Sequence, residues 1–183
     1  MKYLGDQPFA DVYKIQGLRG IYVASQIINI ADPTTISRIE PKNLKSLITF
    51  DQGAIWTPIK GMMIIFIWRR KKTLVSFSRV FFLLSILGPK TDEEGRNFTE
   101  CVGSPVYRCN LHLSQQLSSK FPSTRSIPIT SSKSAIGIVM GSGNMGQTLK
   151  QKNNVFVSAD AGLSWHQVLK GSYYFNLGKN GIV

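Results

Sequence analysis

The chain has 183 residues, of which 43% are hydrophobic and 17% are charged, and its formal net charge is +12. This length and composition are typical of one globular domain and exclude a disordered or fibrous protein. The basic residues outside a cluster at 69–79 are scattered singly, and no helix-turn-helix or RNA-binding motif accompanies them. We therefore expect a plain basic surface and no nucleic-acid partner.

The amino terminus, residues 1–6, lacks the apolar stretch and the small-residue cleavage site of a secretory signal peptide. If the protein is secreted or anchored in a membrane, we expect its targeting signal on another part of a longer chain. These residues then represent a fragment or an incomplete gene product.

In chain order, the sequence predicts short strands separated by turns. A turn is expected at 17–20, and loops are expected at 29–45 and 101–109, whereas residues 111–117 are compatible with one or two helical turns. The predicted strands, rich in β-branched and aromatic residues, cover 21–27, 47–50, 135–140, 155–158 and 165–169. Strands with short turns and little helix indicate an all-β fold.

An eight-residue pattern, [S/T]-x-D-x-G-x-x-W, occurs twice, at residues 49–56 and 158–165. The aspartate can accept hydrogen bonds from backbone N–H groups of its own turn. The glycine can take a positive φ, and the tryptophan can cover the hairpin with apolar surface. Each copy predicts an Asp-box hairpin, here called a clasp, as in β-propeller blades. The residues expected to form the clasps are Thr49, Asp51, Gly53 and Trp56, and Ser158, Asp160, Gly162 and Trp165.

The spacing of the clasps gives an estimate of the number of blades. Asp51 and Asp160 are 109 positions apart, or about 82 without residues 61–87, and propeller blades contain roughly 40–50 residues each. We therefore expect the clasps about two blades apart, within a partial β-propeller of three to four blades that covers residues 1–183.

Residues 61–87 differ in style from the rest of the chain. Their apolar stretches are interrupted by the basic run 69–72, and each is shorter than the ~18–20 residues that span a bilayer. We expect neither a membrane span nor a regular blade here. The preferred interpretation is a non-native insertion, such as translated intron sequence, because joining residue 60 to residue 88 restores an ordinary loop.

Residues 141–146 spell G-x-G-x-x-G after an apolar strand, which taken alone is typical of a dinucleotide-binding turn. The residues that follow are too few for a crossover helix, and no parallel βαβ alternation surrounds them. We expect a glycine-rich loop between strands, and no cofactor.

Cys101 and Cys109 are the only cysteines, and Asn97 begins the only N-x-[S/T] triplet. In a cytosolic protein the cysteines can be free thiols, whereas in an extracellular protein they can close a short disulfide loop. A zinc site is not expected, because two cysteines and His112 do not reach the usual ligand number and spacing. The triplet makes Asn97 a candidate for glycosylation.

Several segments together resemble the sortilin family, the vacuolar-protein-sorting receptor ectodomains. The similarity covers nearly the whole chain except residues 61–87, and the segments that carry it are 17–25, 47–53, 109–113, 155–162 and 170–183.

The resemblance implies part of a ten-bladed propeller in the ectodomain of a type I sorting receptor, whose membrane anchor lies outside this fragment. It implies peptide or protein ligands, such as neuropeptides, propeptides and growth factors, and transport between the Golgi, endosomes and the cell surface. The family places a cysteine pair at this position, which favours a disulfide between Cys101 and Cys109.

An alternative from a different class is an Asp-box glycoside hydrolase, because sialidases carry similar hairpins. Asp51 and Asp160 could be imagined as its carboxylate pair. However, a clasp aspartate is engaged by its own turn at the blade periphery, and no cluster of arginines and carboxylates accompanies it. We therefore expect no catalytic residues, no metal site and no enzyme activity.

Overall fold

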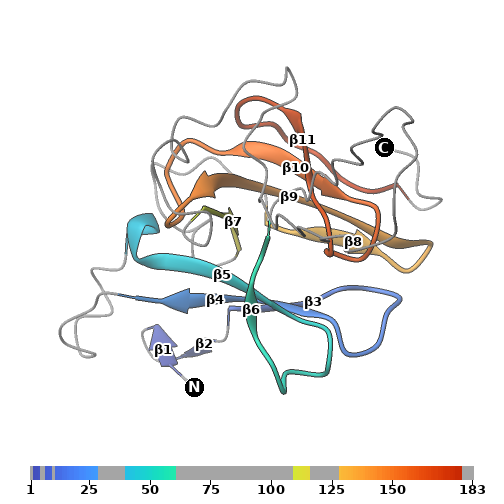
Figure 1. Cartoon of the computed structure of the whole chain (residues 1–183), viewed down its shortest axis with the longest axis horizontal. Helices are drawn as coiled ribbons and strands as arrows, with labels where there is room; N and C mark the ends of the chain where they lie inside the picture. Colours follow the sequence, from blue (N-terminus) through green and yellow to red (C-terminus); the bar gives the residue numbers. More distant parts are fainter. Residues whose placement is uncertain are drawn as a thin grey trace, which may run out of the picture.

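The computed structural model describes residues 2–4, 7–9, 11–28, 40–60, 109–115 and 128–178. In this part of the chain the secondary structure consists of β-strands, with one 3₁₀ helix and no α-helix. All strand pairs are antiparallel, and Figure 1 shows two larger sheets lying one above the other. The prediction of an all-β fold is confirmed for these residues.

The first sheet follows the chain as a simple meander, in the order β3-β4-β5-β6. Val23 of β4 pairs with Ile48 of β5, and both side chains are buried. The first clasp joins β5 to β6, which is a short outer strand containing Pro58. The strands cover Val12–Lys14 (β3), Tyr22–Ile27 (β4), Leu44–Thr49 (β5) and Thr57–Pro58 (β6).

The second sheet repeats this arrangement with a divided first strand. β7 and β8 both pair with the long β9, β7 with residues 143–146 and β8 with residues 135–140, on the edge opposite β10. The second clasp joins β10 to the outer strand β11. The strands cover Asn110–Leu113 (β7), Thr130–Ser132 (β8), Ala135–Gly146 (β9), Asn154–Ser158 (β10) and His166–Leu169 (β11).

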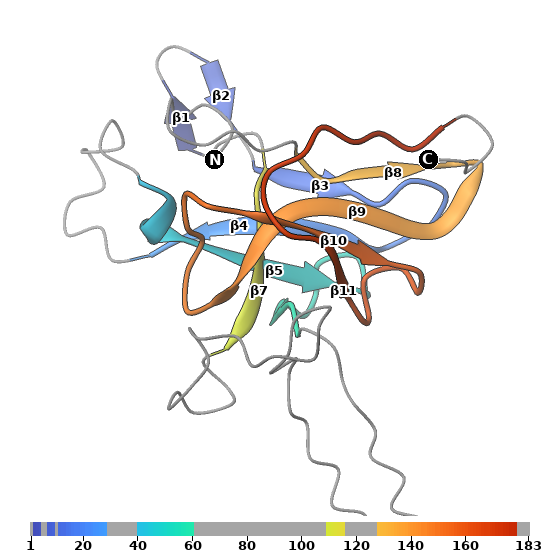
Figure 2. The same ribbon diagram turned by 90° about the horizontal axis from the view of Figure 1, so that it is seen from above.

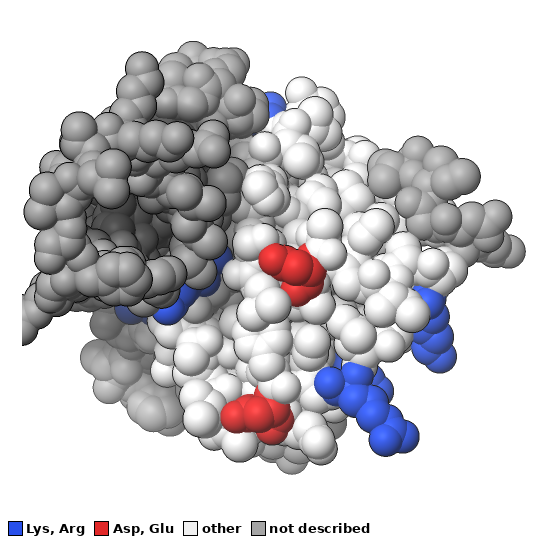
Figure 3. Space-filling model, turned by 45° about the vertical axis from the view of Figure 1, so that its right-hand side comes forward, with Lys and Arg blue, Asp and Glu red and all other residues white. Residues whose placement is uncertain are grey.

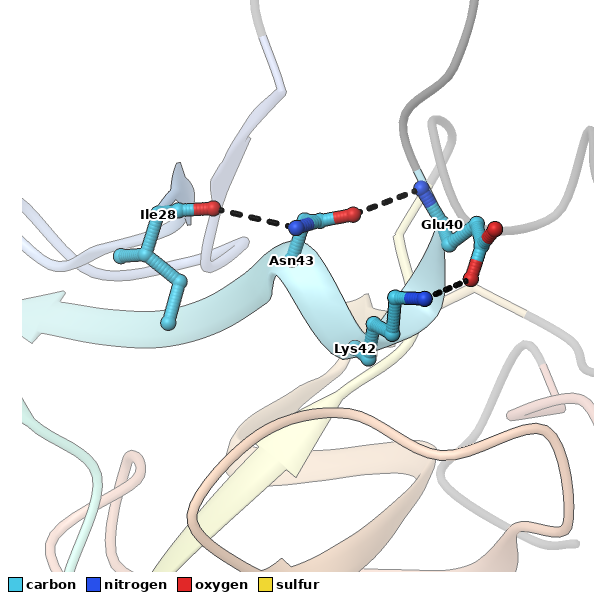
Figure 4. Close-up of polar contacts among 4 residues, drawn as sticks. All are labelled: Ile28, Glu40, Lys42 and Asn43. Atoms are coloured by element: carbon cyan, nitrogen blue, oxygen red, sulfur yellow. Dashed lines mark hydrogen bonds and ion pairs between the residues drawn. The ribbon is translucent and has the colours of Figure 1, made fainter. Parts of the chain in front are cut away.

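A small hairpin precedes the first sheet. It pairs β1, Lys2–Leu4, with β2, Gln7–Phe9. The 3₁₀ helix η2, Pro41–Asn43, leads into β5. Asn43 ties this helix to the end of β4, because its side chain accepts from the Glu40 backbone N–H (3.1 Å) and donates to the Ile28 carbonyl (3.3 Å), as Figure 4 shows. Lys42 and Glu40 form an exposed ion pair beside it.

The main hydrophobic core lies between the two sheets, which Figure 2 shows from above. Both sheets contribute to it, so each covers the apolar face of the other. A hydrogen bond also joins the two sheets, because Tyr13 Oη of β3 lies 2.8 Å from Ser131 Oγ of β8. The buried members of the core are Ile15, Val23, Ile48, Ile59, Cys109, Leu111, Leu113, Ile129, Val139, Met145, Phe156 and Trp165.

The outer face of the second sheet carries a second, smaller cluster. Met140 of β9 and Val155 of β10 are buried there against Leu177, with Phe175 packed at the side. The segment that follows β11 therefore covers the outer face of the second sheet.

Several expected elements differ from the structure. Residues 141–146 continue β9 and do not form a loop, and residues 110–113 form β7 where helical turns were considered. The spacing predicts clasps two blades apart, but the structure places them in neighbouring sheets: Leu111 N donates to Ile59 O, which joins the start of the second sheet directly to the end of the first. Residues 61–87, Asn97 and Cys101 lie outside the described residues.

Candidate functional site: the two clasps and the joint between the sheets

The first clasp is a turn held by two side chains. Asp51 Oδ1 accepts hydrogen bonds from Thr49 Oγ1 (2.7 Å) and from the Ile55 backbone N–H (2.9 Å). Thr49 Oγ1 in turn accepts from the Gly53 N–H (3.0 Å). These bonds satisfy the backbone groups of a tight turn that the sheet itself leaves unpaired.

The second clasp has the same geometry with one further bond. Asp160 Oδ1 accepts from Ser158 Oγ and from the Ser164 N–H, both at 2.8 Å, and Ser158 Oγ accepts from the Gly162 N–H at the same distance. In addition, Ser164 Oγ donates to Asp160 Oδ2 (2.6 Å). Ser164 occupies the position of Ile55 in the first clasp, so this extra bond is specific to the second copy.

Each clasp is also hydrogen-bonded to a glycine near the start of the second strand of its own sheet. The Gln52 N–H donates to the Gly20 carbonyl (3.0 Å), and the Ala161 N–H donates to the Gly137 carbonyl (2.8 Å). Gln52 and Ala161 follow the two aspartates and have φ of 64° and 63°, respectively. The sequence pattern did not include these residues. The only signal for them was a glycine near the start of the second strand of each sheet, Gly20 and Gly137.

The two tryptophans differ in burial. Trp165 is 1% exposed, belongs to the core between the sheets, and donates from Nε1 to the Gly162 carbonyl (3.0 Å). Trp56 is only half-buried and lies close to Gly53. The difference follows from position, because the second clasp faces the first sheet, whereas the first clasp has no described sheet on the corresponding side.

Gly162 of the second clasp lies close to side chains of the first sheet. A Cβ added at this position would lie 2.7 Å from Ile48 Cδ1 and 3.7 Å from Ile15 Cδ1, and its φ is +95°. Both the backbone conformation and the space around it therefore favour glycine. At the corresponding Gly53, an added Cβ would meet only Trp56, at 3.7 Å.

The clasp carboxylates are held in the ionised form. Hydrogen bonds from the Ile55 backbone and from Thr49 lower the pKa of Asp51. For Asp160, partial burial raises the pKa, but hydrogen bonds from Ser164 and Ser158 outweigh it and leave the pKa lowered. A glycosidase general acid needs the opposite, a raised pKa. The clasps are therefore suited to stabilising turns.

A second polar cluster joins the sheets through β5 and β7. The buried Ser46 of β5 exchanges hydrogen bonds with Leu113, accepting from its N–H (2.7 Å) and donating to its carbonyl (3.2 Å). His112, 1% exposed, accepts from the Ser46 N–H at Nδ1 (3.2 Å), and its Nε2 lies 3.1 Å from the Gly146 carbonyl oxygen. We call Ser46, His112, Leu113 and Gly146 the joint. The sequence excluded a zinc site at His112 and indicated a structural or surface residue; its position between the sheets was not predicted.

A cavity of about 440 Å³ adjoins the joint. Its lining residues include Ser46 and His112, together with Lys45, Pro58, Asn110 and Gln147.

On the side of the molecule in Figure 3, acidic side chains form two separate patches on a largely uncharged surface, and basic ones lie nearer its edge. Among the described residues, no cluster of His, Cys, Asp and Glu could hold a metal ion. Within the same ranges, no helix has the length and apolar character needed to cross a bilayer. Cys109 is buried in the core between the sheets.

The family model and the individual relatives that match this chain belong to the same family. The family model described as Sortilin-Vps10 (sortilin, neurotensin receptor 3) matches residues 3–63 and 71–183. The sortilin-related receptors of Oryctolagus cuniculus and Homo sapiens are 30% and 29% identical over 182 residues, which is 99% of this chain and 6% of each receptor. The vacuolar protein sorting/targeting protein 10 of Ajellomyces capsulatus is 30% identical over 179 residues, 96% of this chain and 10% of that protein.

The chain thus spans only a small part of the length of these curated relatives. Its similarity to them nevertheless extends over both sheets and both clasps, because the family match leaves out only residues 64–70 after its start at residue 3. The chain belongs to the Sortilin-Vps10 family.

Proposed function

We propose that the described residues of this chain form two consecutive blades of a ten-bladed propeller in the ectodomain of a sorting receptor. The observation that carries the proposal is the repetition of one unit. Two antiparallel sheets, each with four strand positions in meander order, pack face to face, and each has its clasp between the last two strands. In a propeller, successive blades repeat such antiparallel sheets around a common axis. The clasp residues Thr49, Asp51, Gly53 and Trp56, and Ser158, Asp160, Gly162 and Trp165, are then structural Asp-boxes.

We further propose that the complete protein binds peptide or protein ligands and sorts them between the Golgi, endosomes and the cell surface. The names of the relatives support this, since they are a sortilin-related receptor and a vacuolar sorting protein. The family description also names a neurotensin receptor, which indicates a peptide as one ligand class. The membrane anchor then belongs to a part of the protein beyond these blades.

The proposed role is binding without catalysis. The clasp carboxylates accept hydrogen bonds from their own turns, and their lowered pKa values do not suit a general acid. No observation favours the Asp-box glycoside hydrolase over a receptor.

Three further assignments belong to this proposal. A disulfide between Cys101 and Cys109 closes a short loop before β7, a cross-link worth about 2–3 kcal/mol in the loop-entropy view. Asn97, which precedes this loop in the sequence, carries a glycan. Residues 61–87 contain an insertion between the two sheets; within them the family match leaves out residues 64–70 and includes the others.

The test is ligand uptake by cells that express the complete reading frame containing this chain. Fluorescent neuropeptides and propeptides are offered at the cell surface, and a fluorogenic sialoside is offered in parallel. The proposal predicts saturable peptide uptake that an excess of unlabelled peptide displaces, and no sialoside hydrolysis above untransfected cells. Sialoside hydrolysis, or a lack of uptake by protein shown to be at the surface, would overturn it.

A further inference from the structure

His112 is a fully buried ionisable side chain placed between the two sheets. The Ser46 backbone N–H can only donate, so Nδ1 of His112 must accept and carry no proton. Nε2 then carries the proton and donates to the Gly146 carbonyl. The two bonds connect β5 of the first sheet, β7, and the end of β9, and both require the neutral imidazole in this single tautomer.

Protonation of His112 would convert Nδ1 from an acceptor into a donor that faces the donor of Ser46. The hydrogen bond between β5 and β7 would be lost, and a positive charge would be left in a buried position without a counter-charge. The neighbouring strands supply none: Lys45 on β5 is positive, and β4, β7 and β9 contain no Asp, Glu, Lys or Arg.

Two features couple protonation of His112 to opening of the joint. Burial lowers the pKa of His112 to about 4, against a reference value of 6.5, and the positive charge of Lys45 acts in the same direction, opposed in part by the bond to Gly146. The cavity beside the joint gives water a route to the cluster once the β5–β7 contact opens. The opened histidine then binds a proton more readily than the closed one.

We propose that His112 is an acid-sensitive latch that closes the contact between the two sheets when neutral and releases it when protonated. The other bonds of the joint, from Ser46 to Leu113, carry no ionisable group and follow the latch passively. This inference rests on the geometry of the joint and does not depend on the proposed receptor function.

The sign of the pH dependence follows from the difference between the two states. Because the closed joint holds the histidine pKa below its value in the open joint, the open state binds more protons at acidic pH. The closed contact is fully stable above pH 6.5 and weakens as the pH falls toward 4. Linkage gives an increase in the opening equilibrium on the order of tenfold between pH 7 and pH 5.

The experiment is amide hydrogen exchange on the full chain at pH 7 and pH 5. The amides of Ser46 and Leu113 report on the joint, and the amide of Ala161, bonded to Gly137 within the second sheet, is the internal reference that cancels the intrinsic pH dependence. We expect the ratio of joint to reference exchange to rise on the order of tenfold at the lower pH.

The variants separate titration from packing. His112→Asn keeps an acceptor for the Ser46 N–H but cannot titrate, so its exchange ratio should be independent of pH. His166→Asn is the matched control, because His166 is the second of only two histidines and is exposed on β11; it should behave as the unmodified chain. Lys45→Gln removes the repelling charge, so the titration midpoint of His112, followed by NMR, should move to higher pH and the acid response should shrink.

An exchange ratio that does not change between pH 7 and pH 5 in the unmodified chain would overturn the proposal. An equal acid response in His112→Asn would do the same. If His112→Asn does not fold, the NMR titration of the unmodified chain and of Lys45→Gln decides: an imidazole already protonated at pH 6, or a midpoint that Lys45→Gln leaves in place, contradicts the latch.

Discussion

At the scale of single residues, each clasp is stabilised by side-chain hydrogen bonds to the aspartate and by a glycine with a positive φ. Asp160 accepts three short hydrogen bonds from two residues, Ser158 and Ser164, and the glycine two residues later supplies the positive φ that the turn requires. Asp51 does the same with fewer bonds and on a more exposed surface. The two copies therefore form a natural comparison within one chain.

Replacing Asp160 by alanine should destabilise the chain more than replacing Asp51. Asp160→Ala removes three side-chain hydrogen bonds, and because the site is mostly exposed we expect a loss of about 1 kcal/mol in the free energy of unfolding. Urea denaturation at pH 7 measures both variants. Equal losses, or a larger loss for Asp51→Ala, would contradict the difference in bonding.

The same carboxylates give a pH dependence. Their pKa values are lowered in the folded chain, so they contribute stability above the ordinary value of 3.8 and lose it as the pH falls through the folded values. Below pH 4, the difference in stability between Asp160→Ala and the unmodified chain should therefore shrink, which denaturation at pH 3 would measure. A constant difference between pH 7 and pH 3 would contradict an ionised acceptor.

Gly162→Ala should couple to Ile48. The added methyl group meets Ile48 Cδ1 as well as an unfavourable φ, whereas Gly53→Ala has the unfavourable φ alone. We expect Gly162→Ala to cost about 1 kcal/mol more than Gly53→Ala. Ile48→Val removes the Cδ1 atom, so a double-mutant cycle should give a favourable coupling of at least about 0.5 kcal/mol. Additive effects would show that the two sheets do not meet here.

At the scale of elements, the glycine-rich motif at residues 141–146 forms part of strand β9 because it pairs closely with β7. A Cβ on Gly143 would collide with the His112 carbonyl oxygen, so the close pairing of β7 and β9 requires glycine. For Gly141, the atoms nearest to an added Cβ belong to side chains, Leu113 Cδ2 at 3.1 Å and Ile129 Cγ1 at 3.5 Å. The motif therefore reflects strand packing in this chain and not phosphate binding.

Gly143→Ala should consequently disrupt the second sheet, whereas Gly141→Ala should be tolerated with local repacking. We expect a loss of about 3 kcal/mol or more for Gly143→Ala, because a collision with backbone cannot be relieved by a rotamer change. For Gly141→Ala we expect about 1 kcal/mol. Thermal denaturation of the two variants measures the difference, and similar melting temperatures would contradict the β7–β9 register.

The elements that sequence predicts correctly are the local ones. The strands around residues 22–27, 154–158 and 166–169 follow from β-branched and aromatic composition. The side-chain hydrogen bonds of residues 49–56 and 158–165 are local as well, because each set lies within eight residues. The extension of β9 and the strand β7 depend on partners far away in the chain, Leu113 with Gly143 for example. Residue composition alone does not carry such pairing.

At the scale of the whole molecule, the main error of sequence reasoning was the distance between the clasps. Only residues 61–87 were set aside as an insertion, whereas the whole interval from Lys60 to Cys109 separates residues that are joined directly, since Leu111 N donates to Ile59 O. Loop length costs little closure entropy, so sequence separation is a weak guide to spatial separation. The joint around His112 was missed for the same reason, because Ser46 and His112 are 66 positions apart.

In the packing of the two sheets, the second clasp lies directly on the face of the first sheet. A nuclear Overhauser experiment on the full chain with labelled isoleucine methyl groups tests this most directly. The structure predicts a cross peak between the Ile48 Cδ1 methyl group and the Gly162 Hα protons, next to the contact within the clasp from Trp165 Nε1–H to Gly162. If the contact within the clasp is observed and the Ile48–Gly162 cross peak is absent, the two sheets are not packed as neighbouring blades.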